Sequence, residues 1–307
     1  MTRVTVTGGS GFLGRYVVDA FQKMGHDVFV PEHREYDLTR EEDVVRMFDD
    51  GAPDIVVHLA AVVGGLGANV ANPATFLYDN LLMGLHLIEH GRRRGIAKFV
   101  KIGTICEYPK HTPVPFSENY LWSGFPDEAT APYGIAKKTI LVQGQVYRQQ
   151  FGMDVIHLLP VNLYGPRDNF DPATSHVVPA LIRKCVEAAE RGDPAVVCWG
   201  DGTASREFLY VEDCAHAILL ATLRYSGADP VNLGSGREVS MRELIAIIKD
   251  LVGFKGDILW DESMPNGQPR RCLDTSRAAA LFGFRASTDF RDGLARTIVW
   301  FRNRCGS

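Results

Sequence analysis

Several features that mark other classes of protein are absent from this sequence of 307 residues. It contains no apolar run that approaches the roughly 20 residues a helix needs to cross a bilayer. Its net charge of −4 provides no basic surface for nucleic acid or for an acidic membrane. A short apolar segment follows Met1 and lacks the pattern of a signal peptide. We therefore expect a cytoplasmic protein that binds neither nucleic acid nor membrane.

The cysteines give no sign of a metal site or of a disulfide framework. The sequence has six of them, and no two form a Cys-x-x-Cys pair. No His and Cys residues cluster with the spacing of zinc ligands. The expectation is therefore six reduced thiols and no bound metal. The six are Cys106, Cys185, Cys198, Cys214, Cys272 and Cys305.

The first half of the chain contains a regular alternation of short apolar runs and longer amphipathic stretches. The apolar runs are rich in Val and Ile, as buried strands are. This alternation predicts an α/β fold with a doubly wound parallel sheet, a Rossmann domain over residues 1–165. The predicted strands are residues 4–7, 27–30, 54–58, 99–102 and 155–159. The predicted helices are residues 13–24, 40–48, 74–94 and 133–151.

The pattern changes after Pro160. Residues 162–172 are rich in Pro, Gly, Asn and Asp, which predicts a long loop. Helical periodicity then returns, which predicts a smaller C-terminal α/β lobe over residues 166–307 that binds the substrate, with residues of about 205–235 returning to the first domain. The predicted helices are residues 177–189, 211–224, 241–252 and 290–303, and the predicted strands are residues 196–199, 231–233 and 257–260.

A glycine-rich loop connects the first predicted strand to the first predicted helix. Its glycines Gly8, Gly11 and Gly14 permit a tight turn, close approach of the backbone to a pyrophosphate, and close packing of helix on strand. The helix N-terminus then offers free N–H groups to the phosphates. Because the loop follows a strand and opens an amphipathic helix, it predicts a dinucleotide site rather than a plain turn. Ser10, Phe12 and Leu13 lie in the same loop.

The choice between NAD and NADP depends on the end of the second strand. An acid there binds the ribose 2′-OH of NAD, and Glu32 is in place for that role. Arg34 follows it and can pair with the 2′-phosphate of NADP. We predict NADP as the cofactor, with NAD the less favoured choice. Asp37 and Leu38 are expected near the adenine, and residues 58–61 at the end of the third strand are expected along the cofactor's path.

Tyr133 and Lys137 are four residues apart and share one face of a predicted helix. An ammonium beside a phenol favours the phenolate, so we expect Lys137 to lower the pKa of Tyr133 below its usual value of about 10. Tyr133 then serves as proton donor to a carbonyl under reduction. Thr104 follows the fourth strand, where ligands bind in open α/β sheets, and is expected to hydrogen-bond the same carbonyl oxygen.

Together these residues resemble the extended short-chain dehydrogenase/reductases over nearly the whole chain, and among them the GDP-L-fucose synthase family. Members of that family epimerise C3 and C5 of GDP-4-keto-6-deoxy-D-mannose and reduce C4 with NADPH. The blocks that carry the narrower resemblance are residues 61–65, 106–110, 132–137, 162–166, 168–170, 175–181, 199–203 and 206–208.

The resemblance implies a role for residues that the pattern alone leaves structural. The family's catalytic Ser, Tyr and Lys fall on Thr104, Tyr133 and Lys137, and its two epimerisation residues fall on Cys106 and His176. Contacts with the nucleotide sugar fall on Lys184, Trp199, Arg206, Asn266 and Arg271. Contacts with the cofactor fall on Gly8, Ser10, Gly11, Phe12, Leu13, Gly14, Arg34, Asp37, Leu38, Leu59, Ala60, Ala61, Ile102, Gly103, Lys137, Pro160, Asn162, Leu163 and His176.

Five positions depart from the family pattern. Ile105 stands where Ser is common. Thr104 replaces Ser and keeps the hydroxyl. Ser10 stands where some members carry a basic residue for the 2′-phosphate, which works against NADP. Glu107 stands where a small or apolar residue is common, next to Cys106. Lys184 stands where Arg is common, and it lacks the bidentate fork for a phosphate.

Two other functions remain open at this point. The first is a redox-neutral nucleotide-sugar epimerase that keeps one NAD bound, which Glu32 favours. The second is the same chemistry on a related GDP-4-keto-deoxy sugar. The resemblance also implies a homodimer that pairs through the helices predicted at residues 74–94 and 133–151.

Overall fold

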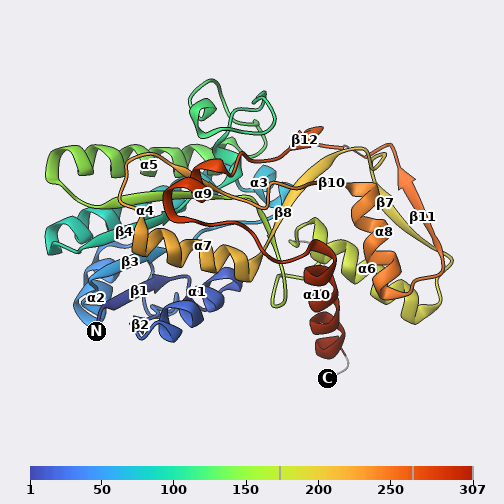
Figure 1. Ribbon diagram of the computed structural model, residues 1–307, viewed down its shortest axis with the longest axis horizontal. Helices are drawn as coiled ribbons and strands as arrows, with labels where there is room; N and C mark the ends of the chain where they lie inside the picture. The colour runs from blue at the N-terminus through green and yellow to red at the C-terminus, as the bar shows by residue number, and fades with distance from the viewer. Residues whose placement is uncertain (173, 265, 306–307) are drawn as a thin grey trace.

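Six parallel strands form the central sheet of the larger of two lobes in the computed structural model, which describes residues 1–172, 174–264 and 266–305 (Figure 1). The strand order is β2-β1-β3-β4-β5-β9. The chain leaves β1 to one side to form β2 and returns to the other side to form β3, so the order reverses beside β1. The six strands are β1 (Arg3–Thr7), β2 (Asp27–Phe29), β3 (Ile55–His58), β4 (Lys98–Ile102), β5 (Val155–Pro160) and β9 (Val231–Leu233).

Helices cover both faces of this sheet. On one face α2, α4 and α5 pack over a core that includes Met47, Leu87 and Ile140. On the other face α1, α7 and α9 pack over a core that includes Phe21 and Ile218. The doubly wound α/β prediction is therefore confirmed. The six helices are α1 (Phe12–Lys23), α2 (Glu41–Gly51), α4 (Pro73–Arg94), α5 (Ala131–Phe151), α7 (Val211–Arg224) and α9 (Ser276–Phe282).

The smaller lobe has a core of its own. Three helices pack around buried side chains such as Ile182, Leu244 and Phe301. A parallel pair of strands, β7 and β11, lies beside them, as the right of Figure 1 shows. These elements are α6 (Val177–Arg191), α8 (Met241–Val252), α10 (Phe290–Cys305), β7 (Ala195–Trp199) and β11 (Asp257–Asp261).

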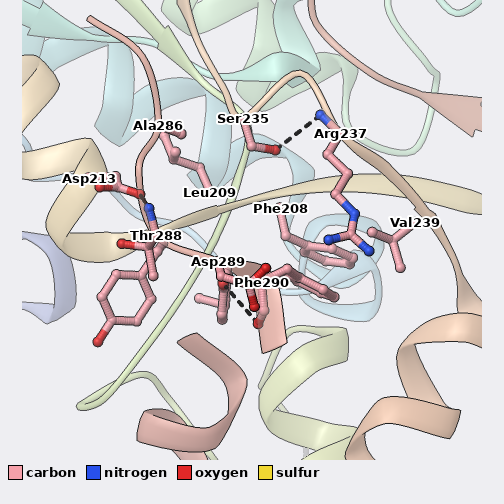
Figure 2. Close-up of a pocket in the computed structure, with 12 residues that line it drawn as sticks. Phe208, Leu209, Asp213, Ser235, Arg237, Val239, Ala286, Thr288, Asp289 and Phe290 are labelled. Atoms are coloured by element: carbon pink, nitrogen blue, oxygen red, sulfur yellow. Dashed lines mark hydrogen bonds between the residues drawn. The ribbon is translucent and has the colours of Figure 1, made fainter. Parts of the chain in front are cut away.

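A second small sheet joins the two lobes. Its long strand β8 pairs with β6, β10 and β12 and then runs directly into α7 of the larger lobe. A cavity of about 200 Å³ lies at this junction, where the Arg237 guanidinium covers the Phe290 ring at 5.6 Å from its centroid (Figure 2). Asp213 closes one side by accepting hydrogen bonds from Ser287 and Thr288. The strands are β6 (Asn162–Tyr164), β8 (Ser205–Tyr210), β10 (Glu238–Ser240) and β12 (Arg270–Arg271).

The prediction of a continuous loop over residues 162–172 was wrong at its start. Asn162–Tyr164 forms strand β6, because its backbone pairs in parallel with Phe208–Tyr210 of β8. Five more elements were not predicted: β8, β10, β12, α9 and the short α3 (Leu66–Ala71). Two 3₁₀ turns, η1 (Ile105–Glu107) and η2 (Glu118–Tyr120), lie in the long connection between β4 and α5.

Two further observations concern the expectations from composition. No described helix has both the length and the apolar character needed to span a membrane. The cysteines whose side chains the structure describes carry free thiols, and four of the five are buried. The side chain of Cys305 is outside the described part.

Candidate active site

A cleft of about 480 Å³ opens at the carboxyl ends of the parallel strands. Residues that follow β3, β4 and β5 line it, as do Arg206 and Arg271 of the joining sheet and Gln268, which precedes β12. The cleft lies beside the point where the strand order reverses, which is where open α/β sheets bind their ligands. Its walls therefore come from both lobes.

The glycine loop has the shape that a pyrophosphate requires. Gly8 has φ +71°, and a Cβ there would lie 2.8 Å from the backbone nitrogen of Ala60. A Cβ on Gly14 would overlap the carbonyl oxygen of Gly8. Gly11 caps α1 in an extended conformation, and no side chain satisfies the N–H groups of the first helical turn. These residues fit a dinucleotide, because they leave backbone donors open toward a phosphate.

The region expected to meet the ribose 2′ position is acidic. Ser10 Oγ donates a hydrogen bond to Glu32 Oε2 at 3.1 Å. Arg34 is directed elsewhere: its side chain is 82% exposed and pairs with Glu35 at 3.5 Å. The side chain of Asp37 accepts hydrogen bonds from Thr39. The glycine loop and the segment after β2 therefore meet through the Glu32 carboxylate, and the Arg34 guanidinium takes no part in this contact.

Of the other residues expected to contact the cofactor, some line the cleft and some lie outside its lining. Leu38 is outside it, buried in the core under α2 and α4. Gly8, Gly11, Gly14 and Ala60 surround the first turn of α1, outside the lining of the cleft. The residues that do line the cleft are Phe12, Leu13, Leu59, Ala61, Ile102, Gly103, Pro160, Asn162, Leu163 and His176.

Thr104 and Cys106 are held on a tight turn after β4. Thr104 is the N-cap of η1, and its hydroxyl accepts a hydrogen bond from the Cys106 N–H at 3.2 Å. Both side chains line the cleft. A Cβ on Gly134 would overlap the Cys106 carbonyl oxygen, so this glycine lets α5 lie directly against the turn. The result places Thr104 and Cys106 beside Tyr133.

Tyr133 and Lys137 occupy one face of α5, as predicted. Tyr133 lines the cleft, and Lys137 Nζ lies 5.7 Å from the centroid of its ring, in the interior. The expected effect on the Tyr133 pKa was wrong for this state of the protein: burial, Cys106 and Glu107 raise it. Burial lowers the pKa of Lys137 to about 8, and Glu107 opposes that change. Burial is the largest of the three causes.

His176 reaches the cleft from the start of α6 in the smaller lobe, whereas Thr104 and Cys106 reach it from the turn after β4. It is the N-cap residue of α6, and its side chain makes no capping hydrogen bond. It lines the cleft and its side chain is in contact with solvent, while the protein around the ring lowers its pKa by desolvation. An imidazole in this position is open to proton exchange with bulk water and with a ligand.

Two of the five predicted sugar-nucleotide contacts lie in the cleft. Arg206 and Arg271 are neighbours on the paired strands β8 and β12. Burial and then the charge of Arg271 lower the pKa of Arg206 to about 10. In the described part of the chain neither guanidinium forms an ion pair with a carboxylate, and Arg271 donates instead to the Gln268 side chain. Glu238 acts on Arg206 from a longer distance and raises its pKa, but it pairs with Arg270. Two adjacent guanidiniums that form no ion pair of their own are suited to a diphosphate.

The other three contacts lie at the end of the smaller lobe. Lys184 Nζ donates to the Val197 carbonyl at 3.1 Å. Trp199 ends β7 and is 64% exposed. Asn266 Oδ1 accepts a hydrogen bond from the Asp201 N–H at 2.9 Å, which holds the turn after β7. None of the three lines the described cleft.

Sequence reasoning missed several residues of the cleft wall. Asn69 on α3 donates to the carbonyls of Gly64 and Gly65, while its own carbonyl oxygen is buried without a partner. Asp127 accepts a hydrogen bond from Gln268 at 3.3 Å across the mouth of the cleft. The resembled block at residues 61–65 was the only signal for this part of the wall. The missed lining residues are Val63, Gly64, Gly65, Asn69, Ile105, Asp127, Ala129, Thr130, Val161, Gly267 and Gln268.

Comparison with known proteins identifies the family. Residues 4–234 match the model of the NAD dependent epimerase/dehydratase family. The chain is 41% identical to GDP-L-fucose synthase 1 of Arabidopsis thaliana, over 99% of this chain and 94% of that protein. The chain therefore belongs to the NAD dependent epimerase/dehydratase family.

Solved structures agree with that assignment. A GDP-L-fucose synthetase from Naegleria fowleri bound to NADP superposes with a TM-score of 0.91 at 26% identity, over 99% of this chain and 95% of that one. A GDP-6-OMe-4-keto-L-xylo-heptose reductase from C. jejuni also gives 0.91 at 26% identity, over 99% and 98% of the two chains. The comparisons confirm an NADP(H)-dependent enzyme of the epimerase and reductase type and do not favour the redox-neutral alternative.

Proposed function

We propose that this chain epimerises C3 and C5 of GDP-4-keto-6-deoxy-D-mannose and reduces C4 with NADPH, giving GDP-L-fucose. The observation that carries the proposal is the common cleft, which brings a thiol and an imidazole together with a hydroxyl and a phenol. A simple reductase needs only the hydroxyl, the phenol and the lysine. The two additional groups supply the acid and base that epimerisation requires.

In the epimerisation, the 4-keto group acidifies the hydrogens on C3 and C5. The Cys106 thiolate removes one of these protons, and the electron pair moves onto the C4 oxygen as an enolate. The hydrogen-bond donors Thr104 and Tyr133 stabilise that oxyanion. His176 in its protonated form returns a proton to the carbon from the opposite side, which inverts the centre. The proton gained by Cys106 and the proton lost by His176 then exchange with solvent.

In the reduction, bound NADPH supplies a hydride to C4. Tyr133 donates its phenolic proton to the C4 oxygen, so that a ketone becomes an alcohol. Thr104 holds the same oxygen by a hydrogen bond, and the buried Lys137 ammonium favours the phenolate that Tyr133 leaves behind. Protonation of Tyr133 from solvent restores the starting state.

The GDP part of the substrate is expected to lie along the wall made by the smaller lobe. Arg206 and Arg271 are neighbouring cations and suit the diphosphate. Trp199 provides an exposed aromatic face for the base, while Lys184 and Asn266 are near it on the end of that lobe. A diphosphate between the two guanidiniums relieves the repulsion that lowers the pKa of Arg206.

An assay in D2O tests the two halves of the reaction separately. With GDP-4-keto-6-deoxy-D-mannose and NADPH, wild type is expected to consume NADPH and to place deuterium on C3 and C5. Cys106→Ser is expected to abolish the deuterium incorporation, because a hydroxyl is a far weaker base than a thiolate. The same variant is expected to reduce a ketone that is already epimerised at close to the wild-type rate. Equal loss of both activities would contradict a dedicated base at Cys106.

The same assay distinguishes the alternatives. If wild type leaves NADPH absorbance unchanged, the bifunctional proposal fails. Turnover with bound NAD and no net oxidation would indicate the redox-neutral epimerase. Faster turnover of a GDP-4-keto-heptose than of the 6-deoxy sugar would indicate that the substrate is a heptose. The similarity in fold to the GDP-6-OMe-4-keto-L-xylo-heptose reductase is the reason to test that sugar.

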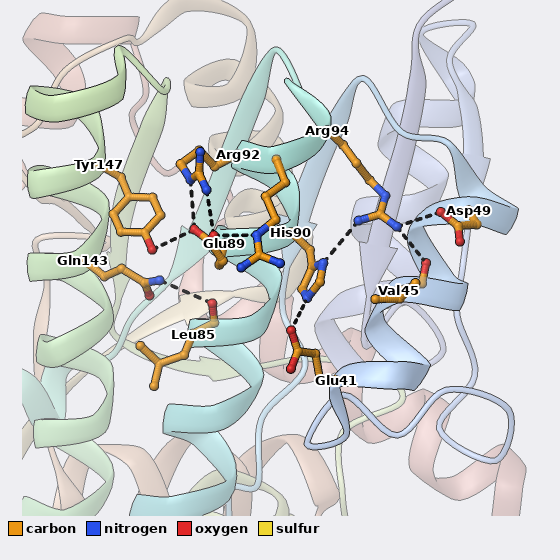
Figure 3. Close-up of polar contacts among 11 residues, drawn as sticks. Glu41, Val45, Asp49, Leu85, Glu89, His90, Arg92, Arg94, Gln143 and Tyr147 are labelled. Carbon is orange, nitrogen blue, oxygen red and sulfur yellow. Dashed lines mark hydrogen bonds and ion pairs between the residues drawn. The ribbon is translucent and has the colours of Figure 1, made fainter.

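We also propose that the chain forms a homodimer through α4 and α5. The two helices lie side by side on one face of the larger lobe (Figure 1). Their outer surface exposes apolar side chains, including Tyr78 at 63% and Val146 at 45%. Glu89 on α4 accepts hydrogen bonds from Tyr147 on α5 and from Arg92, as Figure 3 shows. These hydrogen bonds join α4 to α5. Together the two helices present apolar side chains with polar groups around them, a composition that is typical of dimer interfaces.

A further inference from the structure

A buried cluster of charged side chains lies directly behind the catalytic turn. Lys101 on β4, Glu107 at the end of η1 and His157 on β5 form it, and Glu107 is 0% exposed. None of the three lines the cleft, and the proposed reaction uses none of them. The side chain of Glu107 points into the interior, away from the cleft that Cys106 faces.

The Glu107 carboxylate holds the backbone that carries the reactive side chains. Its Oε1 accepts a hydrogen bond from the Thr104 N–H at 2.9 Å. The Thr104 hydroxyl in turn accepts one from the Cys106 N–H, so the two bonds form a reciprocal capping box. The conformation of Thr104 and Cys106 therefore depends on this carboxylate.

The same cluster reaches α5 through Lys101. Its Nζ donates to the Lys137 carbonyl oxygen at 2.6 Å and lies 3.5 Å from Glu107 Oε1. His157 completes the cluster with Nε2 at 3.0 Å from Glu107 Oε2. Burial lowers the pKa of His157 to about 4, so the ring is neutral at pH 7 and donates its Nε2–H to the carboxylate. One set of contacts thus joins β4, η1, β5 and the Lys137 end of the catalytic helix.

We propose that Glu107 is a positioning residue for the reaction, which fixes Thr104 and Cys106 against α5 and supplies the negative charge that balances Lys101 and Lys137 in the interior. The proposal rests on the proposed function, because it gives Glu107 a part in that reaction. Burial lowers the pKa of Lys101 to about 7 and that of Lys137 to about 8, and the charge of Glu107 opposes both changes. The carboxylate therefore favours the protonated form of two buried amines, whose charge is costly without a counter-charge.

The charge of Glu107 predicts a change in pH dependence when it is removed. The titratable groups that face Glu107 and Lys137 are Lys101 on β4, His157 on β5, His58 on β3, Cys106 in η1, Tyr108 after it, and Tyr133 and Lys138 on α5. Glu107 raises the pKa of both Lys137 and Tyr133. Removal of the Glu107 charge therefore lowers the pKa of Lys137 and of Tyr133. Because the reaction needs Lys137 and Tyr133 in their protonated forms, activity is lost at a lower pH than in wild type.

Glu107→Gln tests the charge while it keeps an oxygen that can accept from Thr104. We expect kcat to fall about tenfold and the alkaline limb of the pH profile to move down by about one pH unit. The KM for the GDP sugar and the dissociation constant for NADP+ should stay within about twofold of wild type, because no ligand contact is altered. Hydrogen–deuterium exchange of the peptide 99–108 should stay close to wild type, because the Thr104 N–H keeps its acceptor.

A second variant covers the case in which the single substitution does not fold. Glu107→Leu combined with Lys101→Met removes both charges, and apolar replacement of a buried ion pair is often neutral for stability. Here the Thr104 amide loses its acceptor, so its exchange should become about tenfold faster while kcat falls at unchanged KM. Wild-type kcat and pH profile in either folded variant would overturn the proposal. A loss that affects thermal stability and NADP+ affinity alike, with no pH shift, would also overturn it. If wild type itself does not turn over the GDP sugar, the proposed function fails, and the exchange of Thr104 still decides on the positioning role.

Discussion

At the scale of single residues, the segment expected to meet the ribose 2′ position carries the negative charge of Glu32, whereas the expected ligand there is a negatively charged 2′-phosphate. Ser10 and Glu32 are hydrogen-bonded to each other where a basic pair would hold a 2′-phosphate. Arg34, the residue expected to supply that charge, is exposed and paired with Glu35. We therefore propose that the glycine loop supplies most of the contacts with NADP(H) and that no basic side chain holds the 2′-phosphate.

Replacement of this pair should strengthen binding of the phosphorylated cofactor. In the double variant Ser10→Arg and Glu32→Thr, a guanidinium replaces a carboxylate beside the 2′-phosphate. A charge-assisted bond of this kind contributes about 1.5–3 kcal/mol, so the dissociation constant for NADP+ should fall by about 10- to 100-fold in calorimetric titration. NAD+ is the matched control and should bind no more tightly. Equal affinity of variant and wild type for NADP+ would show that Ser10 and Glu32 lie away from the ribose.

Asp168 is a second residue whose charge state matters. Burial raises its pKa to about 7, against a hydrogen bond from the Asn169 N–H that lowers it, and its Oδ2 has no partner. The folded protein therefore holds this proton to a higher pH than the unfolded chain. Its contribution to stability is complete at acidic pH and is lost as the pH rises through about 7.

Asp168→Asn should therefore stabilise the protein increasingly as the pH rises above the usual carboxyl pKa of about 4. The amide keeps the acceptor for Asn169 and cannot ionise, so the melting temperature should differ least from wild type below about pH 4, where Asp168 is protonated in both states, and should exceed it by several degrees near pH 8. Asp229→Asn, at an exposed carboxylate, serves as control and should show no such trend. A difference that is independent of pH would mean that Asp168 stays ionised in the fold.

At the scale of elements, the contact between η1 and α5 sets the geometry of the reactive groups. Gly134→Ala would place a methyl group against the Cys106 carbonyl oxygen, which is backbone and cannot rotate away. We expect kcat to fall by an order of magnitude or more while NADP+ still binds, because only the catalytic turn is displaced. Gly67→Ala in α3 is the matched control, since a Cβ there meets nothing within 4 Å. Wild-type kcat in Gly134→Ala would show that the turn adapts freely.

The elements also show what the sequence could predict. The strands of the larger sheet and the helix that carries Tyr133 and Lys137 were found, because short runs rich in Val and Ile alternate there with amphipathic helices and leave a periodic pattern. Strands β6, β8, β10 and β12 were missed, since their pairing depends on residues far away in the sequence. Thr104 could be predicted because it comes directly after a strand of the sheet, and Cys106 because the chain resembles a known family. The bond between Asp127 and Gln268, 141 residues apart, follows from the packing of two loops and leaves no local signal.

At the scale of the whole molecule, the proposed dimer makes a direct prediction. Val146→Glu would put a charge on the outer face of α5, and the desolvation of that charge should prevent pairing. Sedimentation at micromolar concentration should then show a monomer for the variant and a dimer for wild type. Leu223→Glu on α7, at a similarly exposed apolar side chain, should leave the dimer intact. A monomeric wild type would contradict the interface.

The path of the chain between the lobes has a consequence for synthesis on the ribosome. The larger lobe takes β9, α7 and α9 from residues that follow the first strands of the smaller one. A nascent chain that ends near residue 165 thus has β5 as an open sheet edge and α1 without its partner helix. Such an edge pairs readily with other chains. The nucleotide-binding lobe can close only after residues past 280 have left the exit tunnel, so a truncation after the first half is expected to aggregate rather than to bind cofactor.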